Sequence, residues 1–346
     1  MIACAAKGIM LTIHNGGNFM QRRAFLQLAA GVLASGGLAG LAPRVLADAI
    51  EHRGMDAKSF HASRRFMQTS FGRIAYVERG TGPAALFLHG FPLNSFQWCG
   101  ALDRLSPYRR CIAPDFLALG YTEVAEGQSV APDAQVAMLI ALLDALHVST
   151  VDVVANDSGG AVAQLFMTRH PERVRTLLLT NCDTEHESPP AAMKPVIEMA
   201  HQGTYVDRWL VPWLANKTLA RSPQGFGGMC FADPTDPTDE AIECYFTPLT
   251  STPRRKALVN AYAIALEHNP LAGIGDALRR CKVPTRIVWG KDDTIFSVAG
   301  ARYLDETLGH SLGVRYLDHA KLFYPEERPD VIASEARRLW SLVGEA

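Results

Sequence analysis

The chain has 346 residues, a formal net charge of −1 and a hydrophobic fraction of 48%. This length and composition are sufficient for one large globular domain with a continuous core. The charge balance lacks the basic excess that nucleic-acid-binding proteins use, so no nucleic acid is expected as a partner.

An export signal is predicted in residues 1–49. An arginine pair at 22–23 is followed by a short Gly/Ala-rich apolar run and a small-residue A-x-A site at 47–49. This order is typical of a secretory signal and resembles a twin-arginine signal. The apolar run is shorter than the about 20 residues that a membrane span needs. We therefore expect cleavage after residue 49 and a soluble periplasmic product without stable membrane insertion, with Met20 as the expected start.

Strand and helix patterns alternate from about residue 66 onward. The predicted strands lie at 66–80 (a hairpin), 84–90, 111–115, 151–156, 176–181 and 285–290, and the main helical patterns at 133–148 and 160–170. Strands that are apolar on both faces, alternating with helices, are typical of a mostly parallel sheet flanked by helices. The predicted fold class is therefore α/β.

The alternation stops between residues 183 and 269. This stretch contains short helical patterns and loops rich in Pro and Gly, together with many large apolar residues. Such a composition favours an inserted helical lid over the carboxyl ends of the strands rather than a linker. The expected organisation is a core formed by 50–182 and 270–346 with a lid at 183–269.

The cysteines of the mature chain predict no metal or redox site. None of them forms a C-x-x-C pair. Cys230 and Cys244 could form a disulfide in an oxidising compartment, and free buried cysteines are the alternative. Neither a cofactor nor a metal is expected.

The segment "VVANDSGGAV" at 153–162 has the form of a strand, a tight turn of small residues and a helix. This arrangement presents a nucleophile at its apex, near backbone N–H groups that can stabilise an oxyanion. Asp157 and Ser158 are both candidates for the apex, because a glycine stands two positions after each of them. A third interpretation is that Asp157 only caps the following helix.

From Gly159 through "RHPERVRTLLLTN" the chain resembles the α/β-hydrolase fold family. Alignment with the family's G-x-nucleophile-x-G-G pattern, without a gap, puts the nucleophile at Asp157 and Ala155 at the usual first glycine. The resemblance implies the haloalkane dehalogenase and epoxide hydrolase branch, in which a carboxylate attacks carbon and water cleaves the resulting ester. Ser158 as nucleophile would instead imply a serine esterase.

The segment "LFLHGFPLNSFQW" resembles the H-G-x-P loop of the same family. The resemblance implies that the backbone N–H groups of Phe91 and Ser158 form the oxyanion hole. It also implies that His89, Gly90 and Pro92 shape the turn that carries this loop.

Two departures from the family bear on the substrate. Haloalkane dehalogenases usually hold the halide with a Trp after the nucleophile and an Asn in the H-G-N-P loop, where this chain has Ser158 and Phe91. Epoxide hydrolases favour H-G-F-P and use two lid tyrosines, for which Tyr205, Tyr245 and Tyr262 are available. An apolar lid suggests a small, mainly apolar substrate.

The orienting acid and the base complete the expected site. "VPTRIVWGKDDTIFS" resembles the strand and loop that supply the acid, and the G-x-x-D pattern implies Asp293, with Asp183 as an alternative. "LDHAKLFYPEERPDV" resembles the segment of the catalytic histidine, but the alignment puts Leu322 at that position. Leucine cannot accept a proton, so we expect His319 to replace the base after rearrangement of its loop.

Two histidines of the insertion, His186 and His268, are further candidates for the missing base. The sequence thus predicts a cofactor-independent hydrolase with Asp157 as nucleophile, acting on an epoxide, a halide or an ester. The alternatives are the serine esterase and a non-hydrolytic lyase or small-molecule binder on the same scaffold.

Overall fold

A computed structural model of the protein describes residues 56–343, so the predicted export signal lies outside the described residues. The strands are β1 (Arg65–Thr69), β2 (Gly72–Arg79), β3 (Ala84–Leu88), β4 (Arg110–Pro114), β5 (Glu123–Val124), β6 (Val151–Asp157), β7 (Val174–Cys182), β8 (Thr285–Gly290) and β9 (Ser311–Leu317). They form one sheet in the order β1-β2-β4-β3-β6-β7-β8-β9, with β5 paired to β2. From β4 to β9 all neighbours are parallel, whereas β2 is antiparallel to its partners.

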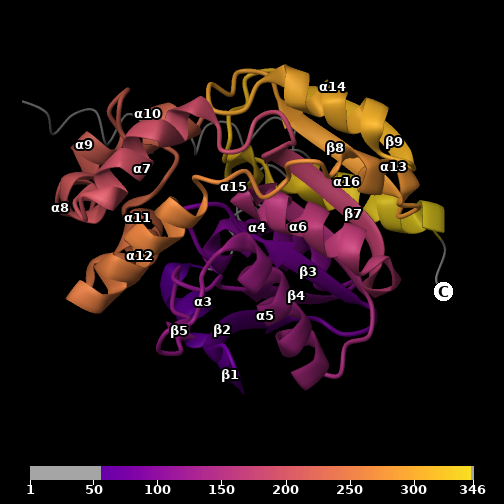
Figure 1. The fold of residues 1–346 in the computed structure, drawn as a ribbon, viewed down its shortest axis with the longest axis horizontal. Coiled ribbons are helices and arrows are strands. Elements are labelled where there is room, and N and C mark those ends of the chain that lie inside the picture. Colours follow the sequence, from indigo (N-terminus) through magenta and orange to yellow (C-terminus); the bar gives the residue numbers. More distant parts are fainter. Residues whose placement is uncertain (1–55, 344–346) are drawn as a thin grey trace, which may run out of the picture. The chain divides into compact units, whose positions relative to one another are not determined.

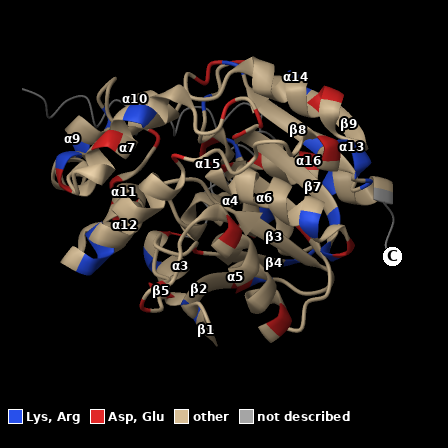
Figure 2. Cartoon of the chain, viewed as in Figure 1, with Lys and Arg blue, Asp and Glu red and all other residues tan. Residues whose placement is uncertain are grey.

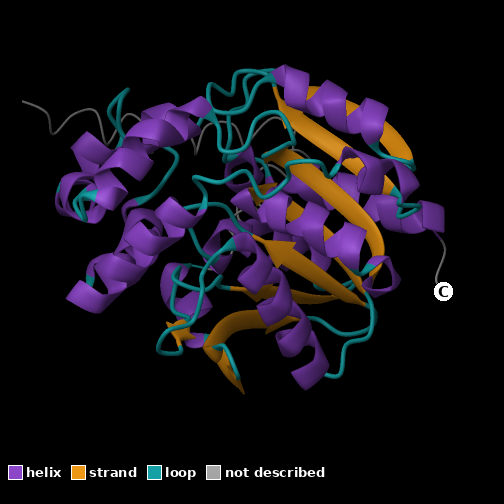
Figure 3. Cartoon of the chain, viewed as in Figure 1, coloured by secondary structure: helices purple, strands orange, loops and turns teal. Residues whose placement is uncertain are grey.

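Helices cover both faces of this sheet, which confirms the expected α/β fold (Figure 3). The helices are α3 (Ala57–Ala62), α4 (Cys99–Leu105), α5 (Pro132–Ala145), α6 (Ser158–Arg169), α7 (Lys194–His201), α8 (Val211–Ala215), α9 (Lys217–Ala220), α10 (Phe226–Cys230), α11 (Asp239–Thr250), α12 (Pro253–Ala265), α13 (Gly275–Arg280), α14 (Val298–Thr307), α15 (Tyr324–Glu327) and α16 (Pro329–Val343). Core residues of α5, α6 and α14 form one hydrophobic cluster, and those of α4 and α16 form a second.

Strand β3 is apolar at every position because helices cover both of its faces. Leu86 and Leu88 belong to the cluster of α5 and α6, whereas Ala85 and Phe87 belong to the cluster of α4 and α16. Successive side chains of a strand point to opposite faces, so a strand covered on both faces must be apolar at every position. All five residues of β3 are buried accordingly.

The edge strand β9 is not among the strands predicted from the sequence. Most of its residues are only half-buried, and it contains Gly313 and Arg315. An edge strand pairs on one side only and tolerates polar residues, so its apolar signal is weak. The hydrophobic pattern therefore predicts the central strands better than this one.

Helices α7 to α12 lie between β7 and β8 in the sequence and gather beside the rest of the fold (Figure 1). A π-helical turn, Val206–Leu210, precedes α8. Aromatic side chains hold this group together. The centre of the Trp213 ring lies 5.2 Å from that of Trp209, 5.9 Å from that of Phe246 and 6.4 Å from that of Phe226. The large apolar residues of the insertion are thus packed together, and they belong to the same hydrophobic cluster as the residues of α5 and α6.

The described residues also bear on the cysteines and the charge. All six described cysteines are free, so Cys230 and Cys244 do not form a disulfide.

Figure 2 shows positions of both charge signs distributed over the helices and loops, in line with the net charge of −1. Within residues 56–343, no helix has the length and apolar character that crossing a membrane requires.

Candidate active site

Asp157 occupies the apex of a strained turn between β6 and α6. It is the last residue of β6 and the N-cap of α6, with φ 55° and ψ −135°. A non-glycine residue at positive φ costs about 1–3 kcal/mol and persists only where the surrounding structure fixes it. Such strain is found where a nucleophile is presented at a strand-to-helix turn.

The two glycines that follow are required by close packing. A Cβ atom on Gly159 would lie 2.5 Å from the carbonyl oxygen of His89, and one on Gly160 would lie 2.3 Å from the Cβ of Cys182. Any larger residue would push the start of α6 away from β3 and β7. The Gly-Gly pair therefore fixes the position of Asp157 relative to both neighbouring strands.

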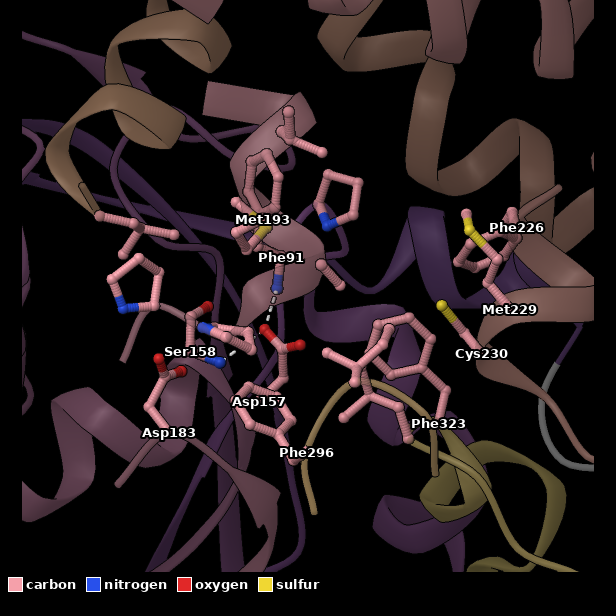
Figure 4. A pocket seen from close by; sticks show the side chains of 18 of the residues that line it. Phe91, Asp157, Ser158, Asp183, Met193, Phe226, Met229, Cys230, Phe296 and Phe323 are labelled. Atoms are coloured by element: carbon pink, nitrogen blue, oxygen red, sulfur yellow. Dashed lines mark hydrogen bonds between the residues drawn. The ribbon is translucent and has the colours of Figure 1, made fainter. Parts of the chain in front are cut away.

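The two carboxylate oxygens of Asp157 have different surroundings. Its Oδ1 atom accepts a hydrogen bond from the amide of Phe91 at 2.9 Å and one from the amide of Ser158 at 2.5 Å. Its Oδ2 atom accepts no hydrogen bond from the described residues. Figure 4 shows the bound oxygen between the two amides. Burial raises the pKa of Asp157, and the amides of Ser158 and Phe91 oppose that rise.

The loop that carries Phe91 is held by His89. The buried ring of His89 donates from Nδ1 to the carbonyl of Gly90 at 2.9 Å and accepts at Nε2 from the amide of Phe116 at 3.0 Å. Burial lowers the pKa of His89, which favours the neutral ring that this pair of bonds requires. The Phe91–Pro92 peptide bond is cis.

Asp157 lies in the wall of an apolar cavity of about 90 Å³. Its apolar lining comes from the H-G-F-P loop, the insertion and the loops after β8 and β9: Phe91, Pro92, Pro189, Pro190, Ala192, Met193, Val196, Trp209, Trp213, Phe226, Met229, Leu266, Ile295, Phe296, Leu322 and Phe323. Its remaining lining residues are Asp157, Ser158, Asp183, Tyr205 and Cys230. This composition suits a small, mainly apolar ligand.

Asp293 lies in the loop after β8 and is held by hydrogen bonds from neighbouring residues. Its Oδ2 atom accepts from the side-chain amide of Asn181 at 2.7 Å, and its Oδ1 atom accepts from the amide of Ile295 at 2.8 Å. Burial raises the pKa of Asp293 to about 7, although these donors oppose the rise. Among the described residues, no histidine is bonded to Asp293, and Asp293 is absent from the cavity lining.

Leu322 lines the cavity at the position where the alignment places the base. His319, which we expected to replace it, does not reach the cavity. Its side chain is 89% exposed, and its Nδ1 atom lies 3.7 Å from the carboxylate of Asp292 on the surface. The carbonyl of His319 accepts a hydrogen bond from Arg328, and the backbone turns outward there with φ 52°. This placement corrects the expectation that His319 acts on the ester at Asp157.

The two histidines of the insertion do not reach the cavity either. His186 is exposed and packs edge-on against the ring of Tyr303 at 4.5 Å, and His268 is exposed. Neither is among the lining residues. The described residues thus bring no histidine, lysine or arginine to the cavity wall.

The three tyrosines of the insertion have separate surroundings. The hydroxyl of Tyr262 lies 3.2 Å from the hydroxyl of Ser158, and that of Tyr245 donates to Glu326 at 2.6 Å. Tyr205 lines the cavity, and its hydroxyl makes no hydrogen bond to another described residue. Tyr205 is therefore the tyrosine whose hydroxyl is available to a ligand.

The position of Asp183 was predicted less firmly than that of Asp293, yet only Asp183 lines the cavity with Asp157. A sequence signal does exist, because Asp183 directly follows β7. Ligand-binding residues gather at the carboxyl ends of parallel strands, and β7 is the neighbour of β6.

Comparison with known proteins agrees with this fold. The sequence model of the alpha/beta hydrolase fold family matches residues 83–327. The chain therefore belongs to the α/β-hydrolase fold family.

Individual relatives match shorter or more divergent stretches. The chain is 43% identical over 108 residues to a haloalkane dehalogenase of Mesorhizobium japonicum, which is 29% of this chain and only 33% of that relative. It is 25% identical over 251 residues to a cis-3-alkyl-4-alkyloxetan-2-one decarboxylase of Shewanella oneidensis, covering 67% of this chain and 74% of the relative. The solved epoxide hydrolase CorEH superposes with a TM-score of 0.67 at 19% identity, covering 81% of this chain and 99% of CorEH.

Proposed function

We propose that this protein is a hydrolase that opens a small, mainly apolar electrophile with Asp157 as the nucleophile. The observation that carries the proposal is the difference between the two oxygens of Asp157. Because Oδ1 is held by the amides of Phe91 and Ser158, the carboxylate is fixed in orientation. The Oδ2 atom keeps its lone pairs for attack on a carbon atom in the cavity.

The same two amides support the second half of the reaction. After attack, Asp157 is an ester through Oδ2, and water must add to its Cγ atom. The negative charge then develops on Oδ1, which already accepts hydrogen bonds from Phe91 and Ser158. Donors that are in place before the charge appears stabilise it without reorganisation, and loss of one such donor typically costs 10²–10³ in rate.

An oxygen leaving group fits the cavity better than a halide. Tyr205 lines the cavity and its hydroxyl has no partner among the described residues, so in this proposal it donates to an oxygen that departs as an alkoxide. The positions that hold a halide donor in haloalkane dehalogenases are Ser158 and Phe91, whose side chains do not supply an indole or amide N–H. We therefore propose an epoxide as the principal substrate class.

The serine esterase alternative receives less support. A serine nucleophile needs an adjacent base to take its proton. The hydroxyl of Ser158 instead pairs with the hydroxyl of Tyr262, and no histidine of the described part of the chain lines the cavity. Attack by the Asp157 carboxylate requires no such proton transfer.

A second candidate function is decarboxylation of a β-lactone, as the name of the Shewanella oneidensis relative suggests for that protein. The absence of histidine, lysine and arginine from the cavity lining, among residues 56–343, favours it. Asp157 would attack C4 of the four-membered ring, and the ring oxygen would leave as a carboxylate. Loss of carbon dioxide would then form an alkene and release the Asp157 carboxylate. Neither step needs water or a base.

Mass spectrometry of the purified mature protein tests the proposal. The protein is incubated with styrene oxide, 1-bromobutane, p-nitrophenyl butyrate or a cis-3,4-dialkyl oxetan-2-one, and its peptides are analysed for covalent esters. We expect an adduct on Asp157 that is absent from Asp157→Asn and present in Asp133→Asn, an exposed surface aspartate. An adduct on Ser158, or full activity of Asp157→Asn, would refute the proposal.

Turnover in H₂¹⁸O separates the two candidate reactions. Hydrolysis through Cγ places the heavy oxygen in the Asp157 carboxylate, because water attacks the ester at that atom. Decarboxylation of the lactone yields an alkene and carbon dioxide and leaves Asp157 unlabelled. The label is read on the peptide that contains Asp157.

We further propose that residues 183–269 act as a lid that selects the substrate, and that residues 1–49 direct export to the periplasm. The apolar cavity lining supports the first proposal, because Met193, Trp209 and Trp213 contribute to it from the insertion. N-terminal sequencing of the protein isolated from periplasm tests the second, with Ile50 as the expected first residue.

A further inference from the structure

Two carboxyl groups line the apolar cavity, those of Asp157 and Asp183. They are neighbours because of strand register: Asp157 at the end of β6 is paired with Cys182 at the end of β7, and Asp183 is the next residue. Figure 4 shows the side chain of Asp183 beside Ser158 and Asp157. A second carboxyl group is thus fixed next to the nucleophile by the sheet itself.

The carboxyl group of Asp183 is buried without a cationic partner. Asp183 is 5% exposed, and it takes part in no ion pair with the described residues. Ser188 opposes the rise in its pKa, and the titratable groups that face it are Asp157, Glu187, Cys182 and Tyr262. Burial first, and the charge of Asp157 second, raise the pKa of Asp183 to about 7. A buried acid that titrates near neutrality is suited to proton transfer at that pH.

We propose that Asp183 is the general base of the hydrolytic step, in the role that Leu322 cannot perform. This inference rests on the proposed function of Asp157 as nucleophile. Among the residues that line the cavity, Asp183 is the remaining carboxylate after Asp157 has been esterified. It therefore can accept a proton from a water molecule in the cavity.

The Asp183 carboxylate takes a proton from water while the water oxygen bonds to Cγ of the Asp157 ester, and the electron pair of the C=O bond moves to Oδ1. Collapse of this intermediate breaks the bond between Cγ and Oδ2, and the departing alkoxide takes the proton from Asp183. Asp157 is left as a carboxylic acid and loses its proton to solvent, so the sum is ester plus water to acid plus alcohol.

The electrostatics of the pair favour this order of events. In the free enzyme the charge on Asp157 raises the pKa of Asp183, which helps to keep the nucleophile ionised and its neighbour protonated. Esterification makes Asp157 neutral and removes that contribution. Asp183 then ionises more readily, so it becomes a carboxylate in the intermediate that needs a base.

The test compares Asp183→Asn with the wild-type protein, using styrene oxide, 1-bromobutane and the oxetan-2-one as probes. Formation of the Asp157 adduct and release of product are measured separately. In Asp183→Asn we expect adduct formation within about threefold of wild type and product release slower by about 10²–10⁴-fold, so that the adduct accumulates. Asp183→Glu keeps the carboxyl group and is expected to retain more release than Asp183→Asn.

Controls distinguish a catalytic role from a structural one. Glu187→Gln changes a carboxylate that faces Asp183 but is bonded to Ser297, and it should release product as wild type does. Product release by the wild type should rise with pH through a midpoint below 7, because the ester at Asp157 no longer raises the pKa of Asp183, and Asp183→Asn should lose this rise. Wild-type release rates in Asp183→Asn, or failure of that variant to form the adduct while Asp183→Glu forms it, would overturn the inference. Full turnover by Asp157→Asn would instead refute the proposed function.

Discussion

The side-chain amide of Asn156 donates a hydrogen bond to the carbonyl oxygen of Leu322, with an N–O distance of 3.1 Å. Asn156 directly precedes the nucleophile, so this bond fixes the backbone of residue 322 beside the nucleophile strand. The same amide also donates to Thr180 and to the carbonyl of Asn181. The backbone of residue 322 is therefore held beside Asp157, although the side chain of Leu322 is apolar.

Leu322→His should place a base next to the ester on Asp157. Because the backbone of residue 322 is already held, we expect release of the adduct to accelerate by about 10²-fold. The same change in an Asp183→Asn background should restore release. Single-turnover kinetics of the adduct measure the effect. Leu322→Gln is the control, because glutamine is polar but cannot act as a base. Equal rates for the two variants would mean that residue 322 cannot act on the ester.

Tyr205→Phe should slow the first step for substrates that lose an oxygen. Removal of one unpaired donor near a developing alkoxide is expected to reduce the rate of adduct formation from styrene oxide by about 10–10²-fold. Adduct formation from 1-bromobutane should change by less than threefold, since bromide needs less help from a hydroxyl donor. Tyr262→Phe is the matched control, because its hydroxyl pairs with Ser158. Similar losses with both probes would contradict a role in donation to oxygen.

Gly90→Ala should disable the nucleophile while the rest of the fold remains in place. An added Cβ would lie 2.6 Å from the Cβ of Asp157, and Cβ atoms in proteins essentially never approach another atom within 3.0 Å. We expect adduct formation to fall at least 10²-fold, because a displacement of about 1 Å at the reacting group has that effect. Gly127→Ala, where an added Cβ meets no atom within 4 Å but φ is +70°, reports the effect of a strained substitution that makes no contact with Asp157. Adduct formation by Gly90→Ala at the wild-type rate would argue against this geometry.

Stability should fall between about pH 4.5 and pH 8 because of a buried carboxyl group away from the cavity. Burial raises the pKa of Glu326 from 4.5 to about 8, although the hydroxyl of Tyr245 donates to it. A group whose pKa is raised in the folded state stabilises below its unfolded pKa, and that contribution is lost as pH rises through the folded value. Glu326→Gln keeps the acceptor and cannot ionise.

We therefore expect Glu326→Gln to be more stable than wild type by roughly 2–4 kcal/mol at pH 9, with little difference at pH 5. Urea unfolding at the two pH values measures this difference. Glu267→Gln, at an exposed ion pair with His201, serves as the control and should leave the pH dependence unchanged. An equal alkaline loss of stability in Glu326→Gln would show that other groups cause it.

The pattern of apolar runs predicted the sheet because burial on two faces leaves no freedom at central positions. Leu86 and Phe87 point to opposite helical layers, and both must be apolar. The turn between β6 and α6 that carries Asp157 was predictable for a related reason, since the backbone contacts at Gly159 exclude any other residue. Constraints of this kind act on single positions and remain visible in the sequence.

The base could not be predicted in this way, because it depends on where a loop directs a side chain. His319 is three residues from the expected position, yet the backbone turns it outward to Asp292. Asp183 is distant in sequence from Asp157, yet parallel pairing of β6 with β7 brings it to the cavity. The sequence by itself determined the fold class, the strand–turn–helix segment at Asp157 and the apolar character of the site, since these follow from local sterics and burial. The tertiary structure alone decided which ionisable groups share the cavity, because that depends on strand register and on the direction of each loop.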